Sequence, residues 1–171
     1  MPTNASLHVH FDSRRTADPV FHMTEDRCRA ALERHPGLAD KVRMSWSWDL
    51  EDIATPLATA DVLVGFRMPR QVIREAAPKL RNIHLIGAGV EHLRPLDWVP
   101  DGLVITNNRG VHRQKAGEYI LLALLMVNNY IPALATAQRD SLWKPLFSTS
   151  VKGKTVLVVG AGKLGSAGAA E

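Results

Sequence analysis

Short apolar segments alternate with helix-forming segments over the first hundred residues, and this alternation limits the possible folds more than any other feature of the chain. Leu7, Val9 and Phe11 alternate with two histidines, as in a strand with one drier face. The expected strands lie at 7–11, 43–48, 61–66, 82–87 and 102–107. Strands that alternate with helices predict a parallel sheet covered by helices, in an α/β unit that ends near residue 105.

Capping and helix-breaking residues mark helices between these strands. Thr24 is a suitable N-cap for the segment EDRCRAALERH, and Pro36 with Gly37 ends that helix. Pro69 suits the first turn of the next helix, RQVIREAA, because the N–H that proline lacks would have no partner there.

A long apolar segment, QKAGEYILLALLMVNN, follows at 114–129. A helix that is apolar almost all round must be buried. One small domain cannot cover it, so we expect a second domain or a partner subunit to do so, and a homodimer when the protein is complete. Pro132 is expected to kink or restart the helix, which then continues to about Arg139.

Composition excludes several classes of protein. The formal net charge is +4, but the basic residues are scattered, which argues against a nucleic-acid partner. Cys28 is the only cysteine, so no disulfide forms within the chain. The N-terminal residues lack the pattern of a signal peptide, and the apolar run at 119–127 is far shorter than the ~20 residues of a membrane span. We therefore expect a cytoplasmic protein without a membrane partner.

A glycine motif near the C-terminus carries the clearest chemical signal. The β-prone segment 155–159 predicts a strand that leads into the G-x-G-x-x-G sequence. In that motif the first glycine permits a tight turn, the second lets the backbone approach a pyrophosphate, and the third lets helix and strand pack closely. The alternative is an ordinary glycine-rich turn in another α/β protein. The candidate residues for binding NAD or NADP are Gly160, Gly162, Lys163, Leu164 and Gly165.

Four stretches occur in order from about residue 60: ADVLVGF, APKLRNIHLIGAGVEHL, VITNNRGVHRQKAGEYILLALL and WKPLFSTSVKGKTVLVVGAGKLG. In this order and at this spacing they resemble the D-isomer-specific 2-hydroxyacid dehydrogenases. The sequence departs from that pattern at Gly117, in place of an alanine, and at Ser166, in place of a larger residue such as arginine. The first 60 residues fit only in their pattern of strands and helices.

The resemblance implies a domain organisation. Residues 1–105 would form a flavodoxin-like domain that binds substrate, and 106–150 would form the interdomain helix and a crossing segment. Residues 151–171 would be the first strand and glycine loop of an incomplete Rossmann domain, so the chain resembles the N-terminal part of such an enzyme. The acidic residue that distinguishes NAD from NADP, about 20 positions beyond the glycines, would follow Glu171.

The resemblance also implies where the substrate lies. The backbone at Ala88, Gly89 and Val90 would approach the substrate carboxylate, although a simple strand-to-helix turn explains Gly89 equally well. The family's catalytic Arg, His and acid all belong to segments beyond Glu171. We therefore assign no catalytic residue, and none of the seven histidines is nominated as an acid or base. His8 and His10 share a strand face, but without further ligands at metal spacing we predict no metal site.

The implied reaction is hydride transfer between NAD(P)H and a small 2-oxo or 2-hydroxy acid. We expect the 171 residues alone to be inactive, because a single strand and half a helix cannot form a nucleotide-binding sheet. Three alternatives stay open: a non-enzymatic NAD(H)-binding regulator of the same fold, a non-catalytic truncated remnant, and a self-standing α/β module whose final glycines form an ordinary turn.

Overall fold

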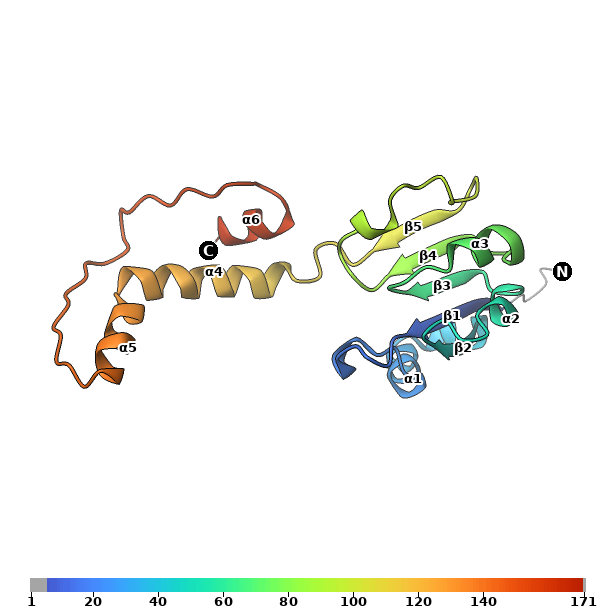
Figure 1. Ribbon diagram of the computed structural model, residues 1–171, viewed down its shortest axis with the longest axis horizontal. Coiled ribbons are helices and arrows are strands. Elements are labelled where there is room, and N and C mark those ends of the chain that lie inside the picture. Colours follow the sequence, from blue (N-terminus) through green and yellow to red (C-terminus); the bar gives the residue numbers. More distant parts are fainter. Residues whose placement is uncertain (1–5, 171) are drawn as a thin grey trace. The chain divides into compact units, whose positions relative to one another are not determined.

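Five parallel strands form one sheet in the order β2-β1-β3-β4-β5 (Figure 1). The computed structural model describes residues 6–170; residues 1–5, where a signal peptide would begin, lie outside the described part. The strands are β1 (Leu7–Ser13), β2 (Val42–Trp48), β3 (Val62–Gly65), β4 (Asn82–Leu85) and β5 (Val104–Asn107). This confirms the predicted α/β class and parallel sheet, and the strand order is that of flavodoxin-like folds.

Helices and 3-10 turns connect the strands. The helices of this part of the chain are α1 (Glu25–Glu33), α2 (Ala54–Leu57) and α3 (Arg70–Ala76), with 3-10 turns at Pro19–Phe21, Pro36–Lys41 and Glu91–Leu93. Thr24 caps α1 as predicted, since its side chain accepts a hydrogen bond from Arg27 N at 3.4 Å. Pro69 is the N-cap of α3, one position earlier than expected.

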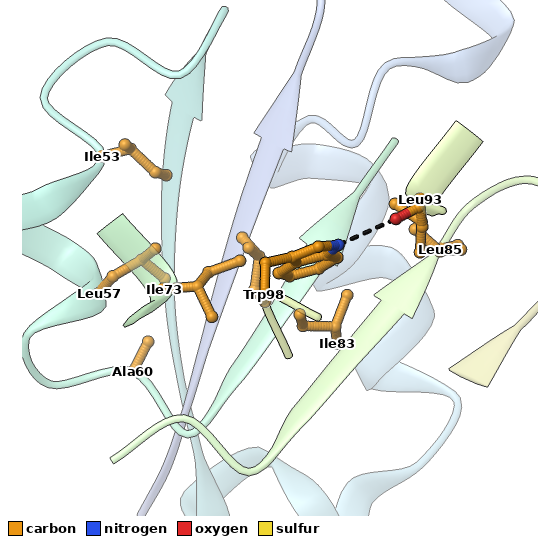
Figure 2. Close-up of a cluster of buried hydrophobic side chains, with 9 residues drawn as sticks. Ile53, Leu57, Ala60, Ile73, Ile83, Leu85, Leu93 and Trp98 are labelled. Atoms are coloured by element: carbon orange, nitrogen blue, oxygen red, sulfur yellow. Dashed lines mark hydrogen bonds between the residues drawn. The ribbon is translucent and has the colours of Figure 1, made fainter. Parts of the chain in front are cut away.

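The hydrophobic core lies against the strands β3 and β4 (Figure 2). Trp98 is 4% exposed, and its indole N–H donates to the carbonyl oxygen of Leu93 at 2.9 Å. The side chains of Leu57, Leu63 and Ile83 are fully buried. The core cluster consists of Ile53, Leu57, Ala60, Leu63, Ile73, Ile83, Leu85, Leu93 and Trp98. Side chains from α2 and α3 thus pack against one face of β3 and β4.

The chain divides into two units, Met1–Asn108 and Arg109–Glu171. The second contains α4 (Arg113–Asn128), α5 (Ile131–Arg139) and α6 (Lys163–Gly168). As predicted, the long helix ends just before Pro132, and Tyr130 takes a left-handed conformation (φ 56°) between α4 and α5. Within residues 6–170, no single helix is long and apolar enough to cross a membrane; α4 and α5, which meet at 64°, reach that length only together.

Within the second unit, several apolar side chains of α4 stay exposed. Tyr119 is 68% exposed, Leu122 is 52% exposed and Val127 is 70% exposed. The buried residue of α4 is Gly117, the departure noted in the sequence, and Ile120 packs against Gly168 of α6. Residues 109–170 by themselves therefore do not cover this helix.

The strand predicted at 155–159 does not form, so this prediction is wrong for the chain described here. Leu157 is 86% exposed and Val159 is 92% exposed, and the segment has no strand neighbour in the described residues. High β-propensity does not make a strand by itself, because the backbone groups of a strand need a partner strand to bond.

The core predicts a clear stability difference between two leucine substitutions. We expect Leu57→Ala to lower the free energy of unfolding by about 2–5 kcal/mol, because it leaves a cavity in a fully buried site. Leu96→Ala is the matched control, since Leu96 is 48% exposed, and should change stability by less than about 0.5 kcal/mol. Urea unfolding followed by tryptophan fluorescence measures both, and equal losses would contradict this placement of the core.

Candidate functional site

A cavity of about 260 Å³ lies at the carboxyl edge of the sheet, where β1, β3 and β4 end. Each of these strands contributes the residues at or just beyond its last position. The lining residues are Asp12, Ser13, Arg14, Ala17, Phe21, Phe66, Arg67, Ile86 and Gly87. Within the sheet, β2 lies next to β1 on one side and β3 lies next to β1 on the other, so the strand order reverses direction at β1. Ligands of open α/β sheets bind at such a switch point.

The predicted substrate loop follows directly after the cavity wall. Ala88 and Gly89 are exposed and Val90 is half-buried, and none of the three lines the cavity itself. The loop is held from β5: Asn107 Nδ2 donates to the carbonyl oxygen of Ala88 at 2.9 Å. Asn108 holds the preceding residues through its backbone N–H, which donates to Gly87 O at 3.1 Å. The loop is thus anchored, and two of its residues, Ala88 and Gly89, are exposed next to the cavity.

Sequence reasoning did not identify Asp12, Arg14 and Arg67 as members of this site. Asp12 is 4% exposed, whereas both arginines are exposed. The sequence did contain a usable signal, because a polar residue that ends a parallel strand lies at the edge where ligands bind. Burial raises the pKa of the Asp12 carboxyl group, and hydrogen bonds from Ser47 and from the backbone of Leu50 act in the opposite direction.

A row of polar side chains leads from the cavity along β1 and β2. His8 is 3% exposed and His10 is fully buried, and both rings face the serines of β2. Ser45 lies within hydrogen-bond distance of both rings, and Ser47 lies between His10 and Asp12. Both nitrogens of each ring thus have protein partners.

Burial keeps both histidines neutral. It lowers the pKa of His10 to about 4, and the neighbouring His8 adds to this effect. The pKa of His8 is also lowered, first by burial and then by the guanidinium of Arg43. A histidine whose folded-state pKa lies below its unfolded value of about 6.5 stabilises the fold only while it is neutral.

The low histidine pKa values predict acid sensitivity. Since the unfolded chain binds these protons more tightly, stability is fully present above about pH 6.5 and falls as the pH drops toward 4. His10 alone accounts for up to about 3 kcal/mol at the acid end. Urea unfolding from pH 7 to pH 4 measures the slope.

The matched variants for this measurement are His10→Gln and His35→Gln. The first removes the buried titrating ring, so its stability should depend less on pH than that of the parent chain. His35 is exposed and its replacement should preserve the parent slope. The raised pKa of Asp12 works in the opposite sense and is common to all three chains. Identical slopes in all three would contradict the neutral, buried state of His10.

The glycine loop has a conformation that needs glycine at two of its three positions. Gly160 has a φ of +98°, in the left-handed region that side chains avoid. A Cβ atom at Gly165 would overlap the carbonyl oxygen of Gly160, so the third glycine allows close packing within the loop. Gly162 is the N-cap of α6, and a Cβ there would meet open space. Lys163 and Leu164 are exposed in the first turn of α6.

This geometry predicts different outcomes for two alanine substitutions. Gly165→Ala should disrupt the loop and α6 at a cost of about 1–3 kcal/mol, because a backbone atom must move to admit the methyl group. Gly162→Ala should leave the local structure intact, because its backbone angles and surroundings accept a side chain. Amide hydrogen exchange over α6 reports the difference, and equal protection in both variants would be inconsistent with the described loop.

Comparisons with known proteins agree with the motifs. No protein-family model matches the chain. It is 30% identical over 135 residues to D-3-phosphoglycerate dehydrogenase of Mycobacterium tuberculosis, and the match covers 75% of this chain and 25% of that protein. It is 31% identical over 101 residues to glyoxylate reductase of Thermofilum pendens, and this match covers 56% of this chain and 30% of that protein. The chain thus spans only about a quarter of the length of these curated relatives.

Solved structures show the same fold over almost the whole chain. A D-isomer specific 2-hydroxyacid dehydrogenase from Xanthobacter autotrophicus matches with a TM-score of 0.69 and 24% identity, over 95% of this chain and 49% of that one. A family protein from Aeromonas salmonicida matches with a TM-score of 0.68 and 21% identity, over 96% of this chain and 49% of that one.

Proposed function

Because this chain belongs to the D-isomer-specific 2-hydroxyacid dehydrogenases, we propose that it supplies the substrate-binding part of an enzyme that interconverts a small 2-oxo acid and its 2-hydroxy acid. The observation that carries the proposal is the cavity at the carboxyl edge of the sheet, beside the anchored loop 88–90. A cavity at the switch point of a parallel sheet is the expected place for a small ligand.

The acid binds to the loop and to the charges around the cavity. The backbone N–H groups of Ala88, Gly89 and Val90 can donate to the substrate carboxylate, which would replace the Glu91 carboxylate that now lies against Gly89. Arg14 and Arg67 add positive charge at the cavity wall. Together these groups orient a small anion against the edge of the sheet, and orientation is a large part of what such an enzyme contributes.

The cofactor is NAD or NADP, which supplies or accepts the hydride. The residues that would hold it fit the role: the open space at Gly162 admits a pyrophosphate near the start of α6, and Gly160 and Gly165 fix the turn around it. Lys163 and Leu164 continue this binding segment. The Xanthobacter protein was solved with NADPH, and a relative from Rhizobium etli with NADP.

In our proposal, residues 1–105 bind substrate, 106–150 form the interdomain segment and 151–171 begin the cofactor domain. A protonated His, a carboxylate-binding Arg and an acid are contributed by later segments, so the 171 residues alone do not turn over. The exposed apolar face of α4 forms a homodimer interface in the complete, cytoplasmic protein. No nucleic acid or membrane takes part.

Binding of oxalate, an unreactive two-carbon acid, tests the site in the 171-residue chain. In ¹⁵N-labelled chain, oxalate should shift the amide signals of residues 86–90 and of Ser13, because the anion sits on their backbone and in the cavity. Acetamide, a neutral molecule of similar size, is the control and should leave these signals unchanged. Oxalate shifts confined to other parts of the chain would refute the proposed site.

An NADH-linked assay with glyoxylate, pyruvate and hydroxypyruvate tests the roles proposed for the domains. The 171 residues should show no turnover, and the product of the native gene should reduce at least one of these acids. Clear activity from residues 1–171 alone would overturn the proposed domain roles. Binding of NADH by the native product without any turnover would favour the non-enzymatic regulator.

A further inference from the structure

The carboxylate of Asp12 is the end of a hydrogen-bonded chain that runs across the sheet from β2 into the cavity. Asp12 lines the cavity and is 4% exposed. A buried carboxylate at a ligand cavity requires explanation, because removing its charge from water is costly unless donors compensate. The donors here come from a row of side chains whose protons can be assigned one after another.

Arg43 sets the direction of this row, because a guanidinium donates hydrogen bonds and never accepts them. Its Nη2 lies 2.8 Å from Nδ1 of His8, so Nδ1 accepts. The neutral ring therefore carries its proton on Nε2, which lies 2.7 Å from Ser45 Oγ and donates to it. Thr59 Oγ1 also lies near Nδ1, at 3.1 Å, and accepts from Arg43.

The same direction continues to the cavity. Ser45 Oγ accepts from His8 and donates its own hydrogen to Nδ1 of His10 at 2.8 Å. His10 therefore carries its proton on Nε2 and donates to Ser47 Oγ at 2.9 Å. Ser47 in turn donates to Oδ1 of Asp12 at 2.7 Å. Each ring and each serine between Arg43 and Asp12 accepts from the member before it and donates to the member after it, so the hydrogen bonds run in one direction.

This row is a positioning device and not a path for protons, because Arg43 keeps its proton at any ordinary pH. It fixes one oxygen of Asp12: Oδ1 accepts from Ser47 and, at 2.9 Å, from the backbone N–H of Leu50. Over residues 6–170 no side chain or backbone group donates to Oδ2. Oδ2 is thus the acceptor that Asp12 offers to a ligand in the cavity.

The other lining residues define what kind of ligand can use this acceptor. Two arginines, Arg14 and Arg67, line the cavity against the one acid Asp12, although Arg67 also pairs with Asp49 at 3.7 Å, and this excess of positive charge disfavours an ammonium group as the donor. The rest of the wall is largely apolar, with Ala17, Phe21 and Phe66. We propose that Asp12 Oδ2 accepts a hydrogen bond from a hydroxyl group of an anionic ligand, so that the cavity selects hydroxylated acids over alkyl acids.

This inference rests on the proposed function and names the substrate class: 2-hydroxy or 2-oxo acids with a further hydroxyl group. D-glycerate and D-lactate are the matched probes, since they differ by one hydroxyl at C3. Titration into the ¹⁵N-labelled 171-residue chain, followed by the amide signals of Ser13 and residues 86–90, gives the two dissociation constants. We expect D-glycerate to bind about tenfold more tightly, as for a hydrogen bond to a charged acceptor.

Asp12→Asn tests the acceptor itself. The amide keeps an oxygen for Ser47 and replaces the charged acceptor with a neutral donor, so the ratio of the two dissociation constants should fall, because hydrogen bonds to charged acceptors are the stronger ones. The ratio is the appropriate measure, because loss of a negative charge strengthens binding of both anions alike. Amide spectra of the variant establish that the sheet is retained.

Ser47→Ala and Ser47→Thr test the row of hydrogen-bonded side chains and leave the acceptor Asp12 unchanged. Removal of the hydroxyl should raise the pKa of Asp12, read from its ¹³C carboxyl signal, and reduce the preference for D-glycerate. Threonine restores the hydroxyl and should restore both. A row with a merely structural role would lower stability in the alanine variant and leave the preference unchanged.

The outcomes separate this inference from the proposed function. Equal affinities for the two acids in the parent chain would overturn the role of Asp12 and leave the acid site in place. A preference for D-glycerate that is undiminished in Asp12→Asn would also overturn it, because another group would then bind the hydroxyl. If neither acid affects the cavity residues, both the proposed site and this inference fall.

Discussion

Strand β1 lies between β2 and β3 and bonds to both, and the features of functional interest depend on this double pairing. Its register places His10 opposite Ser45 on one side and opposite Leu63 on the other. Residues in register share a face of the sheet, so the polar row and the apolar core lie side by side on that face. The same pairing brings Asp12 to the carboxyl edge, where the cavity opens. A slip of β1 by one residue would turn His8, His10 and Asp12 to the opposite face.

The polar row of His8, Ser45, His10 and Ser47 shows how a sheet can bury two imidazole rings with a partner for every ring nitrogen. His10 is fully buried in a face that otherwise packs isoleucine and leucine. Hydrogen bonds in a medium of low dielectric polarise one another, so a row with one direction is more stable than its separate pairs suggest. The arrangement requires both rings to be neutral, which agrees with the low pKa of His10 and links the integrity of the cavity wall to pH.

Much of the architecture could be predicted from the sequence because it depends on local patterns. Apolar runs located the five strands, Thr24 located the start of α1 and Pro132 the restart at α5. The segment 155–159 shows the limit, since a strand depends on neighbours that propensity does not supply. Asp12 and the polar row escaped prediction for a related reason. His8 and Ser45 are far apart in the chain, and only the register of a parallel pair reveals that their side chains meet.

The one-way character of the polar row also constrains how this sequence can diverge. A single replacement in the row leaves a buried donor or acceptor without its partner, whereas replacement of the whole row by apolar side chains of similar shape can be nearly neutral. Homologues should therefore carry the histidines and serines of β1 and β2 together or lack them together. Coordinated inheritance of His8, His10, Ser45 and Ser47 would mark the lineages that retained this way of holding the carboxylate.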